Sequence, residues 1–310
     1  MKSVISQHPL LLTYLKNVTR TGRLGGLTNK NLLVDTLQGK FVLRVPGEGT
    51  AEYINRLSEK HAAMVTSELG VNAPVLYFDE VSGVQLCAFI ENALTMNSET
   101  FRDLSAVARA ARSFSKVHTS GASFKNRFEL FQMIDNYLQI LEGKGAKLPE
   151  GFDAVRLEAG TVRTALNRHP TPVVPCHCDP LAENFLDDGK QMFIIDWEYS
   201  GNNDPMWDLG DLCVEAGFNE EQEEALFSAY FADGKPRPFD RGRMVLHKAM
   251  CDLLWTLWGV IQHANQNPAD DFWAYSLKRF ERCKKLMKSS GFSRHLSAVM
   301  DGPGALPTLH

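Results

Sequence analysis

The sequence lacks the signals of several large classes of protein. Its six cysteines include no Cys-x-x-Cys pair, so neither a disulfide framework nor a zinc ribbon is indicated, and free thiols in a reducing compartment are predicted. No run of basic residues is present, and 33 Lys and Arg against 37 Asp and Glu give a formal net charge of −4. A nucleic acid, which binds largely through its phosphate charges, is therefore not an expected partner.

Long apolar runs are missing as well. The longest, residues 253–261, is far shorter than the roughly 20 residues needed to cross a bilayer. The apolar patch at 10–12 is followed at once by Lys16 and Arg20, without a small-residue cleavage site. No membrane partner is expected, and a cytoplasmic location is predicted. With 44% hydrophobic and 23% charged residues, the 310-residue chain has the composition of a folded enzyme of roughly two lobes.

Common catalytic signatures are also absent. The Gly-Lys pairs beginning at positions 39, 143, 189 and 234 are followed by Phe, Gly, Gln and Pro, so none forms a P-loop. The sequence contains no Gly-x-Ser-x-Gly and no His-Glu-x-x-His, and the Gly-Glu-Gly at 47–49 lacks the third glycine of a dinucleotide-binding turn. A P-loop ATPase is excluded, and hydrolase, zinc protease and dehydrogenase classes are disfavoured.

Short strands dominate the first part of the sequence, and helices dominate the rest. Turn residues separate strand candidates at 31–35, 41–45, 75–78 and 84–90, with one amphipathic helix predicted over 51–69. Helices are then predicted at 98–118, 128–141, 155–167, 206–216, 220–231, 241–265 and 271–289, and the tail from Asp301 is expected to be loose. The predicted fold is α+β, with an N-terminal lobe at 1–92 and a C-terminal lobe at 93–310.

The helical pattern is interrupted at 170–200, where chemically active side chains concentrate. His177-Cys-Asp179-Pro-Leu-Ala-Glu-Asn184 is followed by a strand candidate at 192–195 and then by Asp196. Mg²⁺ prefers one or two carboxylates plus substrate phosphates, so Asn184 and Asp196 are predicted to hold it on a nucleotide. Asp179 is then left to accept the hydrogen bond of an acceptor hydroxyl, and His177 to brace the loop.

These residues have other interpretations. His177 and Asp179 alone could form a loop salt bridge. The Cys-His-Cys-Asp run at 176–179 also looks like a soft-metal cluster, but adjacent ligands rarely close a tetrahedral site and no second Cys/His cluster lies near in sequence. Glu198 either assists the metal or bonds to the catalytic loop. Magnesium is therefore favoured over zinc, and the role of Glu198 stays open.

The spacing His-x-Asp-x-x-x-x-Asn with a downstream strand and Asp resembles the catalytic loop and metal-binding Asp of eukaryotic-like kinases. Within them it is most similar to choline/ethanolamine kinases and the related aminoglycoside phosphotransferases. The resemblance covers most of the chain, continuing through Trp-Asp-Leu-Gly-Asp at 207–211 and a tryptophan-bearing helix at 254–262. It implies a two-lobed protein-kinase-like fold with a small antiparallel N-terminal lobe and a mostly helical C-terminal lobe, and ATP and Mg²⁺ as cofactors.

The resemblance also implies roles in the N-terminal lobe. Gly-Gly-Leu-Thr-Asn at 25–29 resembles the family's substitute for the glycine-rich loop, where backbone N–H groups can approach phosphate. Arg44 takes the place of the usual phosphate-binding lysine, Glu59 holds it, and 89–91 forms the hinge that meets adenine. Alone, the glycines are only a turn and Arg44 is a surface strand residue. The implied nucleotide-binding residues are Gly26, Thr28, Asn29, Arg44, Glu59, Phe89 and Glu91.

Trp255 and Trp258 are three residues apart and therefore share one face of the predicted helix. Tryptophan faces bind quaternary ammonium groups by cation–π attraction, so a cationic acceptor is favoured. The alternative for this pair is core packing. Asp208 is predicted to add attraction for a cation, and Tyr199 and Trp207 are further candidates for the aromatic cage.

The predicted function is transfer of the γ-phosphoryl group of ATP to the hydroxyl of a small cationic alcohol, with choline first and ethanolamine next. A thiamine or aminoglycoside kinase is the enzyme alternative, because the same catalytic parts serve other acceptors. A catalytically weak nucleotide-binding module is the other alternative, and the presence of Asp179, Asn184 and Asp196 argues against it. The sequence does not predict the oligomeric state.

Overall fold

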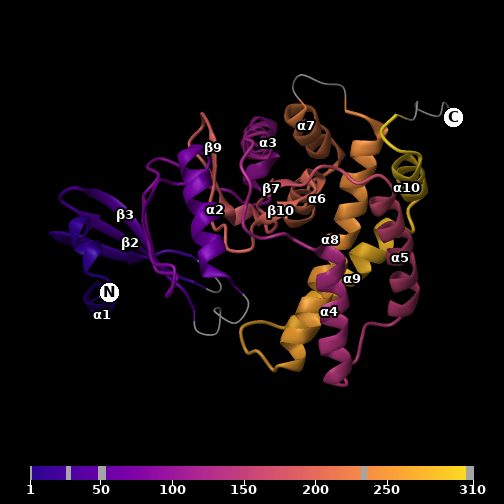
Figure 1. Cartoon of the computed structure of the whole chain (residues 1–310), viewed down its shortest axis with the longest axis horizontal. Coiled ribbons are helices and arrows are strands. Elements are labelled where there is room, and N and C mark those ends of the chain that lie inside the picture. Colours follow the sequence, from indigo (N-terminus) through magenta and orange to yellow (C-terminus); the bar gives the residue numbers. More distant parts are fainter. Residues whose placement is uncertain (1, 26–28, 48–53, 232–235, 305–310) are drawn as a thin grey trace.

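The computed structural model describes residues 2–25, 29–47, 54–231 and 236–304, and its first part is an antiparallel sheet (Figure 1). Five strands pair in the order β1-β2-β3-β5-β4. They are β1 (Val18–Arg23), β2 (Lys30–Thr36), β3 (Gly39–Val45), β4 (Val75–Phe78) and β5 (Gln85–Ala88). The predicted α+β order, with strands first and helices after, is confirmed.

One face of the sheet is apolar because alternate side chains along its strands are buried. Leu43 of β3 lies opposite Leu86 of β5, and both are completely buried. Helix α1 (Lys2–Gln7) and the 3-10 helix η1 (Pro9–Thr13) bring Leu11 into the same cluster. These two short helices were not predicted, because each is too short to show a periodic pattern and their place is set by packing on the sheet.

Helix α2 (Arg56–Glu68) lies between the sheet and the helical part of the chain (Figure 1). Its N-terminus is capped by Asn55, whose side chain accepts a hydrogen bond from the N–H of Ser58 at 3.1 Å. The chain leaves the helix at Gly70, where φ is +66°. A helix was predicted here over 51–69, of which 51–53 lie outside the described residues.

Two small sheets lie among the helices that follow. One has the strand order β6-β8-β9, and in the other β7 pairs with β10. Their strands are β6 (Leu94–Thr95), β7 (Val174–Cys176), β8 (Phe185–Asp187), β9 (Met192–Ile194) and β10 (Gly201–Asn203). The β7–β8 and β9–β10 connections carry the predicted catalytic and metal-binding residues, so these small sheets hold the two loops together.

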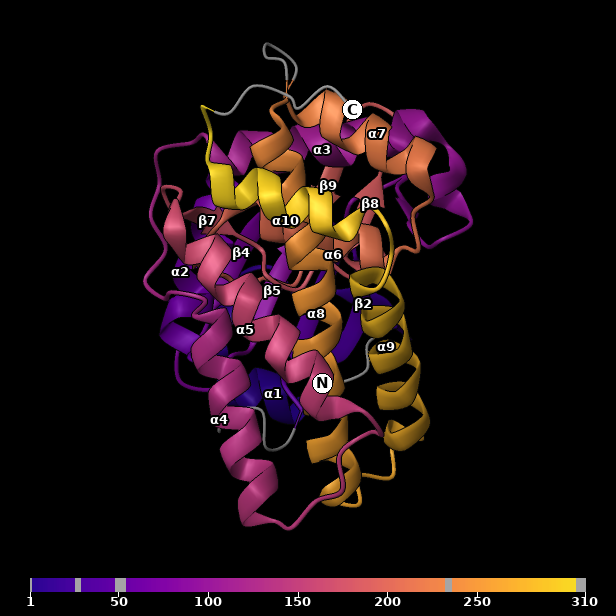
Figure 2. The same cartoon turned by 90° about the vertical axis from the view of Figure 1, so that its right-hand side faces the viewer.

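Helix α8 is the centre of the helical part. It contacts α4, α5, α6, α9 and α10, and Figure 2 shows it running between α5 and α9. By length and composition it could cross a membrane, but 89% of its apolar window is buried inside the protein, so it is a core helix. The larger helices are α3 (Leu104–His118), α4 (Leu130–Gly143), α5 (Phe152–Arg168), α6 (Pro205–Glu215), α7 (Glu220–Tyr230), α8 (Pro238–Ala264), α9 (Phe272–Met287) and α10 (Phe292–Asp301).

Some helix ends differ from the predictions. The helix predicted from residue 98 begins only at Leu104, because the Asp103 side chain accepts the N–H of Ser105 at 2.9 Å and so caps it there. Helix α10 was not predicted. It packs so closely on α8 that a Cβ at Gly242 would lie 2.7 Å from the carbonyl oxygen of His295. Of the tail predicted to be loose, residues 305–310 lie outside the described residues.

The packing of α6 on α8 gives a testable prediction. A Cβ at Gly210 would lie 2.8 Å from the carbonyl oxygen of Met244 on α8, so Gly210→Ala forces two helix backbones apart. We expect it to lower the free energy of unfolding by about 1–3 kcal/mol, measured by urea denaturation. Gly160→Ala is the matched control, because Gly160 sits in exposed α5 with no atom near its Cβ position. That change should raise the free energy of unfolding by roughly 0.5–1 kcal/mol. Equal effects of the two changes would contradict the close packing of α6 on α8 at Gly210.

Candidate active site

The loop after β7 is held by one buried carboxylate. Asp208 on α6 accepts hydrogen bonds from the backbone N–H groups of His177 at 2.7 Å and Cys178 at 2.8 Å. The Oδ2 atom, which accepts the N–H of His177, also lies 3.0 Å from the Nε2 atom of His118. Cys178 has φ of +70°, a conformation that is uncommon for a non-glycine residue and that the carboxylate stabilises.

The predicted acceptor roles of Asp208 and Trp207 are therefore corrected. Asp208 is completely buried and both its oxygens are engaged by the loop, so it does not face an acceptor. Trp207 is also completely buried, donates its indole N–H to the carbonyl oxygen of Cys178 at 3.2 Å, and packs on Phe128. Both residues support the loop from the interior. Their types suggested cation binding, but the sequence does not show which way a side chain points.

His177 lies between the two catalytic loops. Its Nε2 atom is 2.9 Å from the carbonyl oxygen of Ile195, and its Nδ1 accepts the N–H of Asp179 at 3.3 Å. Burial lowers the pKa of His177. Because Nδ1 accepts an N–H, the ring proton is assigned to Nε2, which faces the carbonyl oxygen of Ile195. The ring also packs against Trp197 at 4.8 Å. These contacts join the two loops through His177, and its bracing role stays a prediction.

Asp179 sits at the tip of this loop and is half-buried. Burial raises its pKa to about 8, because the charged carboxylate loses water. The carboxylates of Glu215 and Asp196 raise the pKa further, whereas Arg279 opposes them. Asp179 therefore lies close to carboxylates from two elements, Asp196 on the β9–β10 loop and Glu215 on α6.

Asn184 and Asp196 are brought side by side by the backbone. The N–H of Ile195 donates to the carbonyl oxygen of Asn184 at 2.9 Å, which joins the two loops next to both predicted metal ligands. The Asn184 amide nitrogen donates to the backbone oxygen of Asp179 at 3.2 Å, so its side-chain oxygen is the atom suited to a metal. An amide oxygen and a carboxylate are hard ligands, and this donor set fits Mg²⁺.

Arg44 on β3 links the sheet to this metal-ligand pair. Its guanidinium donates to Asp196 Oδ1 at 2.8 Å and forms an ion pair with Glu59 on α2. Asp196 has φ of +67°, an uncommon value for a non-glycine residue, just after the end of β9. The structure therefore brings Arg44, Glu59 and Asp196 together, with Arg44 and Glu59 both buried. The alternative that Arg44 is a surface strand residue is wrong.

A second arginine, Arg56, extends this ionic chain and had no predicted role. Its Nη1 atom is 2.7 Å from Glu59 Oε2 and 3.5 Å from Glu198 Oε2. Asn29 donates to the same oxygen of Glu198 at 3.2 Å. Burial and the neighbouring Asp196 raise the pKa of Glu198. The sequence signal for Arg56 was its spacing three residues before Glu59, which places both on one face of α2.

The other nucleotide-binding predictions meet the structure only in part. Gly26 and Thr28 lie outside the described residues. In the predicted hinge, the N–H of Phe89 donates to the carbonyl oxygen of Lys40 at 3.0 Å, so this amide belongs to the sheet and is not available to adenine. Glu91 lies on the surface, with its carboxylate 3.6 Å from the Lys40 ammonium.

A chain of aromatic rings runs from Tyr199 through α8 to α9. Tyr199 meets Trp255 edge-on at 6.0 Å between ring centroids, and Trp255 meets Trp258 edge-on at 6.1 Å. Trp258 continues the chain to Phe272 and Tyr275 of α9. Trp255 is only 6% exposed and belongs to the core of the helical part, whereas Trp258 is half-buried at the edge of that core. Trp258 and Tyr199 are thus the more accessible rings.

Two carboxylates beside these rings were missed in the sequence. Asp211 and Glu215 stand one turn apart on α6, and the thiol of Cys251 on α8 lies 3.0 Å from Asp211 Oδ1. Glu215 pairs with Arg279 of α9 at 2.7 Å. Among the neighbouring carboxylates, Glu215 raises the pKa of Asp179 the most. The i, i+4 spacing of the two acids on one helix face was the available signal.

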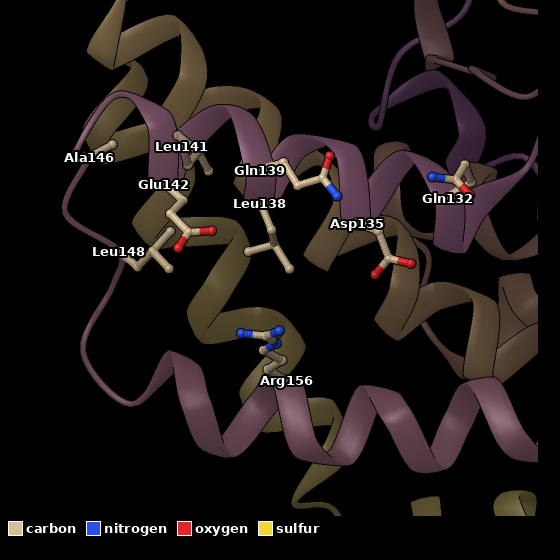
Figure 3. A pocket seen from close by; sticks show the side chains of 9 residues that line it. All are labelled: Gln132, Asp135, Leu138, Gln139, Leu141, Glu142, Ala146, Leu148 and Arg156. Carbon is tan, nitrogen blue, oxygen red and sulfur yellow. The ribbon is translucent and has the colours of Figure 1, made fainter.

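A separate cavity of about 640 Å³ lies between α4 and α5 and contains none of the predicted site residues (Figure 3). Its lining mixes apolar side chains with polar ones at the rim, and the Arg156 side chain extends from α5 toward α4. The predicted catalytic and metal-binding residues lie instead at the β7–β8 and β9–β10 loops. The lining residues are Gln132, Asp135, Leu138, Gln139, Leu141, Glu142, Ala146, Leu148 and Arg156.

The five-stranded sheet followed by helices, with the paired β7–β8 and β9–β10 loops between them, is a kinase-like fold. The solved aminoglycoside phosphotransferase APH(4)-Ia shares it with a TM-score of 0.64 at 14% identity, covering 92% of this chain and 100% of that one. The sequence profile of the choline/ethanolamine kinase family matches residues 22–236. The chain therefore belongs to the choline/ethanolamine kinase family.

Individual relatives agree with this assignment. Protein LicA of Haemophilus influenzae is 30% identical over 272 residues, which cover 86% of this chain and 79% of LicA. A solved choline/ethanolamine kinase family protein from Mesorhizobium loti is 50% identical, with a TM-score of 0.88 over 97% of this chain and 100% of that one. Solved choline kinase LicA from Streptococcus pneumoniae is 28% identical, with a TM-score of 0.77 over 92% and 98%.

The loop support by Asp208 can be tested by a change of one atom. Asp208→Asn replaces one acceptor oxygen by an NH₂ group that faces donors in the interior, so a buried hydrogen bond is lost. We expect the free energy of unfolding to fall by about 2–4 kcal/mol and turnover to fall with it. Urea denaturation and steady-state kinetics measure the two effects. Glu158→Gln on the exposed face of α5 is the control, and an equally small effect of both changes would contradict the support role.

Proposed function

We propose that the protein transfers the γ-phosphoryl group of ATP to the hydroxyl of a small cationic amino alcohol, with choline as the first candidate. One observation supports the proposal, namely what lies around Asp179. Asn184 donates to the backbone oxygen of Asp179 at 3.2 Å, and the carboxylates of Asp196 and Glu215 both raise the Asp179 pKa. Glu215 in turn pairs with Arg279, whose guanidinium lies over the ring of Tyr275, next to Trp258. An anionic donor and a cationic acceptor would each meet the charge that suits them.

Mg·ATP would occupy the side formed by the two loops and the sheet. The metal, held by Asn184 and Asp196, would neutralise charge on the transferred phosphoryl group. Arg44 would contact the phosphates, with Glu59 fixing its position, and the 25–29 segment would supply backbone N–H groups. Glu198 is held beside Asp196 by Arg56 and Asn29, a position from which its carboxylate supports the metal site.

Asp179 would act on the acceptor. Its carboxylate would accept the hydrogen bond of the hydroxyl and orient that oxygen for in-line attack on the γ-phosphorus. The new oxygen–phosphorus bond forms as the bond to the β-phosphate oxygen breaks, ADP leaves, and the hydroxyl proton passes to Asp179. Little covalent work is asked of the protein, so positioning and charge neutralisation supply most of the effect.

The proposed acceptor side suits a cation. The rings of Tyr199 and Trp258 are partly exposed and both contact the buried ring of Trp255. Glu215 adds a carboxylate, and its partner Arg279 is shared with Asp252. Ethanolamine is the second candidate, since the family includes both kinases. Thiamine and aminoglycosides are the further alternatives. A nucleotide-binding module without catalysis is disfavoured because all three catalytic positions are filled.

Two further proposals follow the same assignment. We place the lobe boundary near residue 92, because β5 pairs with β3 of the first sheet and β6, the next strand, pairs with β8 of the second part. We also propose a cytoplasmic location, since the six cysteines are free thiols and five of them are buried.

The role of Asp179 predicts a separation of binding from turnover. Asp179→Ala should lower turnover by at least about a hundredfold, because the acceptor loses its hydrogen-bond partner. Affinity for Mg·ATP should stay near wild type, because the side chain acts on the acceptor. Stopped-assay kinetics and calorimetric nucleotide titration provide the two readouts. Near-normal turnover would sink the assignment.

Asp196→Ala is the matching contrast, because it removes a charged ligand of the metal. This variant should weaken Mg²⁺-dependent nucleotide binding itself. Equal Mg·ATP affinity with and without Asp196 would move the metal role to another carboxylate, of which Glu198 is the nearest candidate.

The acceptor is tested with choline, ethanolamine, thiamine and an aminoglycoside in a coupled assay of ADP release, together with Trp258→Leu. The leucine keeps apolar bulk and removes the ring quadrupole, so KM for choline should rise by about tenfold or more while KM for ATP hardly changes. Trp273→Leu is the control, since Trp273 contacts His263 and not the ring chain. Unchanged choline kinetics in Trp258→Leu, or a higher kcat/KM for another acceptor in the panel, would overturn choline as the acceptor.

A further inference from the structure

A small basic cavity lies on a different part of the surface from the proposed active site. It has a volume of about 130 Å³ and is formed where α3, the turn after α2 and the β8–β9 turn meet. Figure 1 shows α2, α3 and β9 close together at this place. Four of its nine lining residues are cations, and none is acidic. The lining residues are Gly70, Val71, Arg109, Arg112, Ser113, Lys116, Lys190, Gln191 and Met192.

Three of the four cations have no carboxylate partner among the described residues. Arg109 is the exception, because it makes a two-pronged contact with Asp187 at 2.8 and 2.6 Å. Arg112, Lys116 and Lys190 are exposed and take part in none of the ion pairs found in the described ranges. Lys190 lies near Asp188, whose pKa is lowered by hydrogen bonds from the backbone N–H groups of Gln191 and Lys190 and also by the Lys190 ammonium. On a chain of net charge −4, Arg112 and Lys116 together with Lys190 still form a local excess of positive charge around this hollow.

The framework of the cavity is rigid. Ser113 on α3 donates its hydroxyl to the carbonyl oxygen of Met192 at 2.6 Å, and Ile194 donates its N–H to the carbonyl oxygen of Val71 at 2.8 Å. The Lys116 ammonium lies over Gly70, 3.8 Å from where a Cβ would be. The cations therefore project from a fixed concave wall, whereas an ordinary solvated charged face has no such hollow.

We propose that this cavity binds a phosphate group. The hollow is well below the roughly 300–1,000 Å³ of sites for whole drug-sized ligands, but it has room for one phosphate group. Guanidinium and ammonium groups are the usual protein partners of phosphate, Arg by paired hydrogen bonds and Lys as a point charge. The ligand is a phosphate monoester or inorganic phosphate, or the phosphate of an anionic lipid headgroup. This inference is independent of the proposed function, because it uses none of the residues of the catalytic loops.

The test measures binding without turnover. Protein is first saturated with Mg²⁺ and a non-hydrolysable ATP analogue, so that added phosphate cannot occupy the nucleotide site. Inorganic phosphate and glycerol phosphate are then titrated by calorimetry, and vesicles with and without phosphatidic acid are tested by sedimentation. The variant combines Arg112→Gln, Lys116→Gln and Lys190→Gln, all at exposed positions, and it leaves Arg109 to hold Asp187.

The wild type should bind at least one of these probes, and the variant should bind it at least about tenfold more weakly, with an affinity that falls as salt is raised. A control variant combines Lys278→Gln, Lys285→Gln and Lys288→Gln at exposed positions on and just after α9, which removes the same charge elsewhere. Binding of the soluble probes alone assigns a free phosphate ligand, and binding of the vesicles alone assigns a lipid headgroup. No binding by wild type, or equal losses in the variant and the control, would overturn the site.

Discussion

The catalytic loop depends on the carboxylate of Asp208. A carboxylate removed completely from water is stable only when its charge is met by donors, and here two backbone N–H groups and the ring of His118 meet it. Those two N–H groups belong to the residues just before Asp179. The two hydrogen bonds that these N–H groups donate to Asp208 therefore also fix the direction of the loop just before Asp179. They stabilise the positive φ of Cys178 as well.

A second buried network fixes the other half of the site. Arg44 on β3 and Arg56 on α2 face three carboxylates, those of Glu59 on α2 and of Asp196 and Glu198 on the β9–β10 loop. Buried ion pairs contribute little net stability, because their desolvation offsets most of their attraction. What such a network does supply is position. Each arginine pairs with more than one carboxylate, so neither the sheet, α2 nor the Asp196 loop can shift without losing a charged contact. Ligand binding to Asp196 would compete with Arg44 for the same carboxylate.

The sequence was most informative where function depends on local spacing. The residues from His177 to Asn184 lie on one short loop, and Asp196 follows the next hairpin, so their proximity could be predicted from residue types and intervals alone. Spacing could not give direction. Trp207 and Asp208 have the residue types of a cation site, yet the start of α6 turns both into the interior. Glu215 and Arg56 were overlooked for the converse reason, because only the packing of α6 and α2 shows what they face. Helix α10 and the N-terminal helices escaped because long-range packing, and not local periodicity, determines them.

Under the proposed function, the charged groups on the sheet side of the molecule and those on α6 bear on which acceptor the site would hold, because the two groups differ in charge. Toward the sheet, two arginines share the space with the carboxylates, as an anionic nucleotide requires. Toward α6, Asp211 and Glu215 stand with one arginine, and Asp211 Oδ2 has no hydrogen-bond partner within the described ranges. Rings attract any cation, including one that cannot donate a hydrogen bond, whereas a bare carboxylate oxygen gains most from a donor. Trp258, Tyr199 and Glu215 are each partly exposed, whereas Asp211 is completely buried, so the accessible groups here include two rings and a carboxylate already paired with Arg279. Under the proposed function, that order of exposure would suit a methylated ammonium, which ring faces can hold without a hydrogen bond.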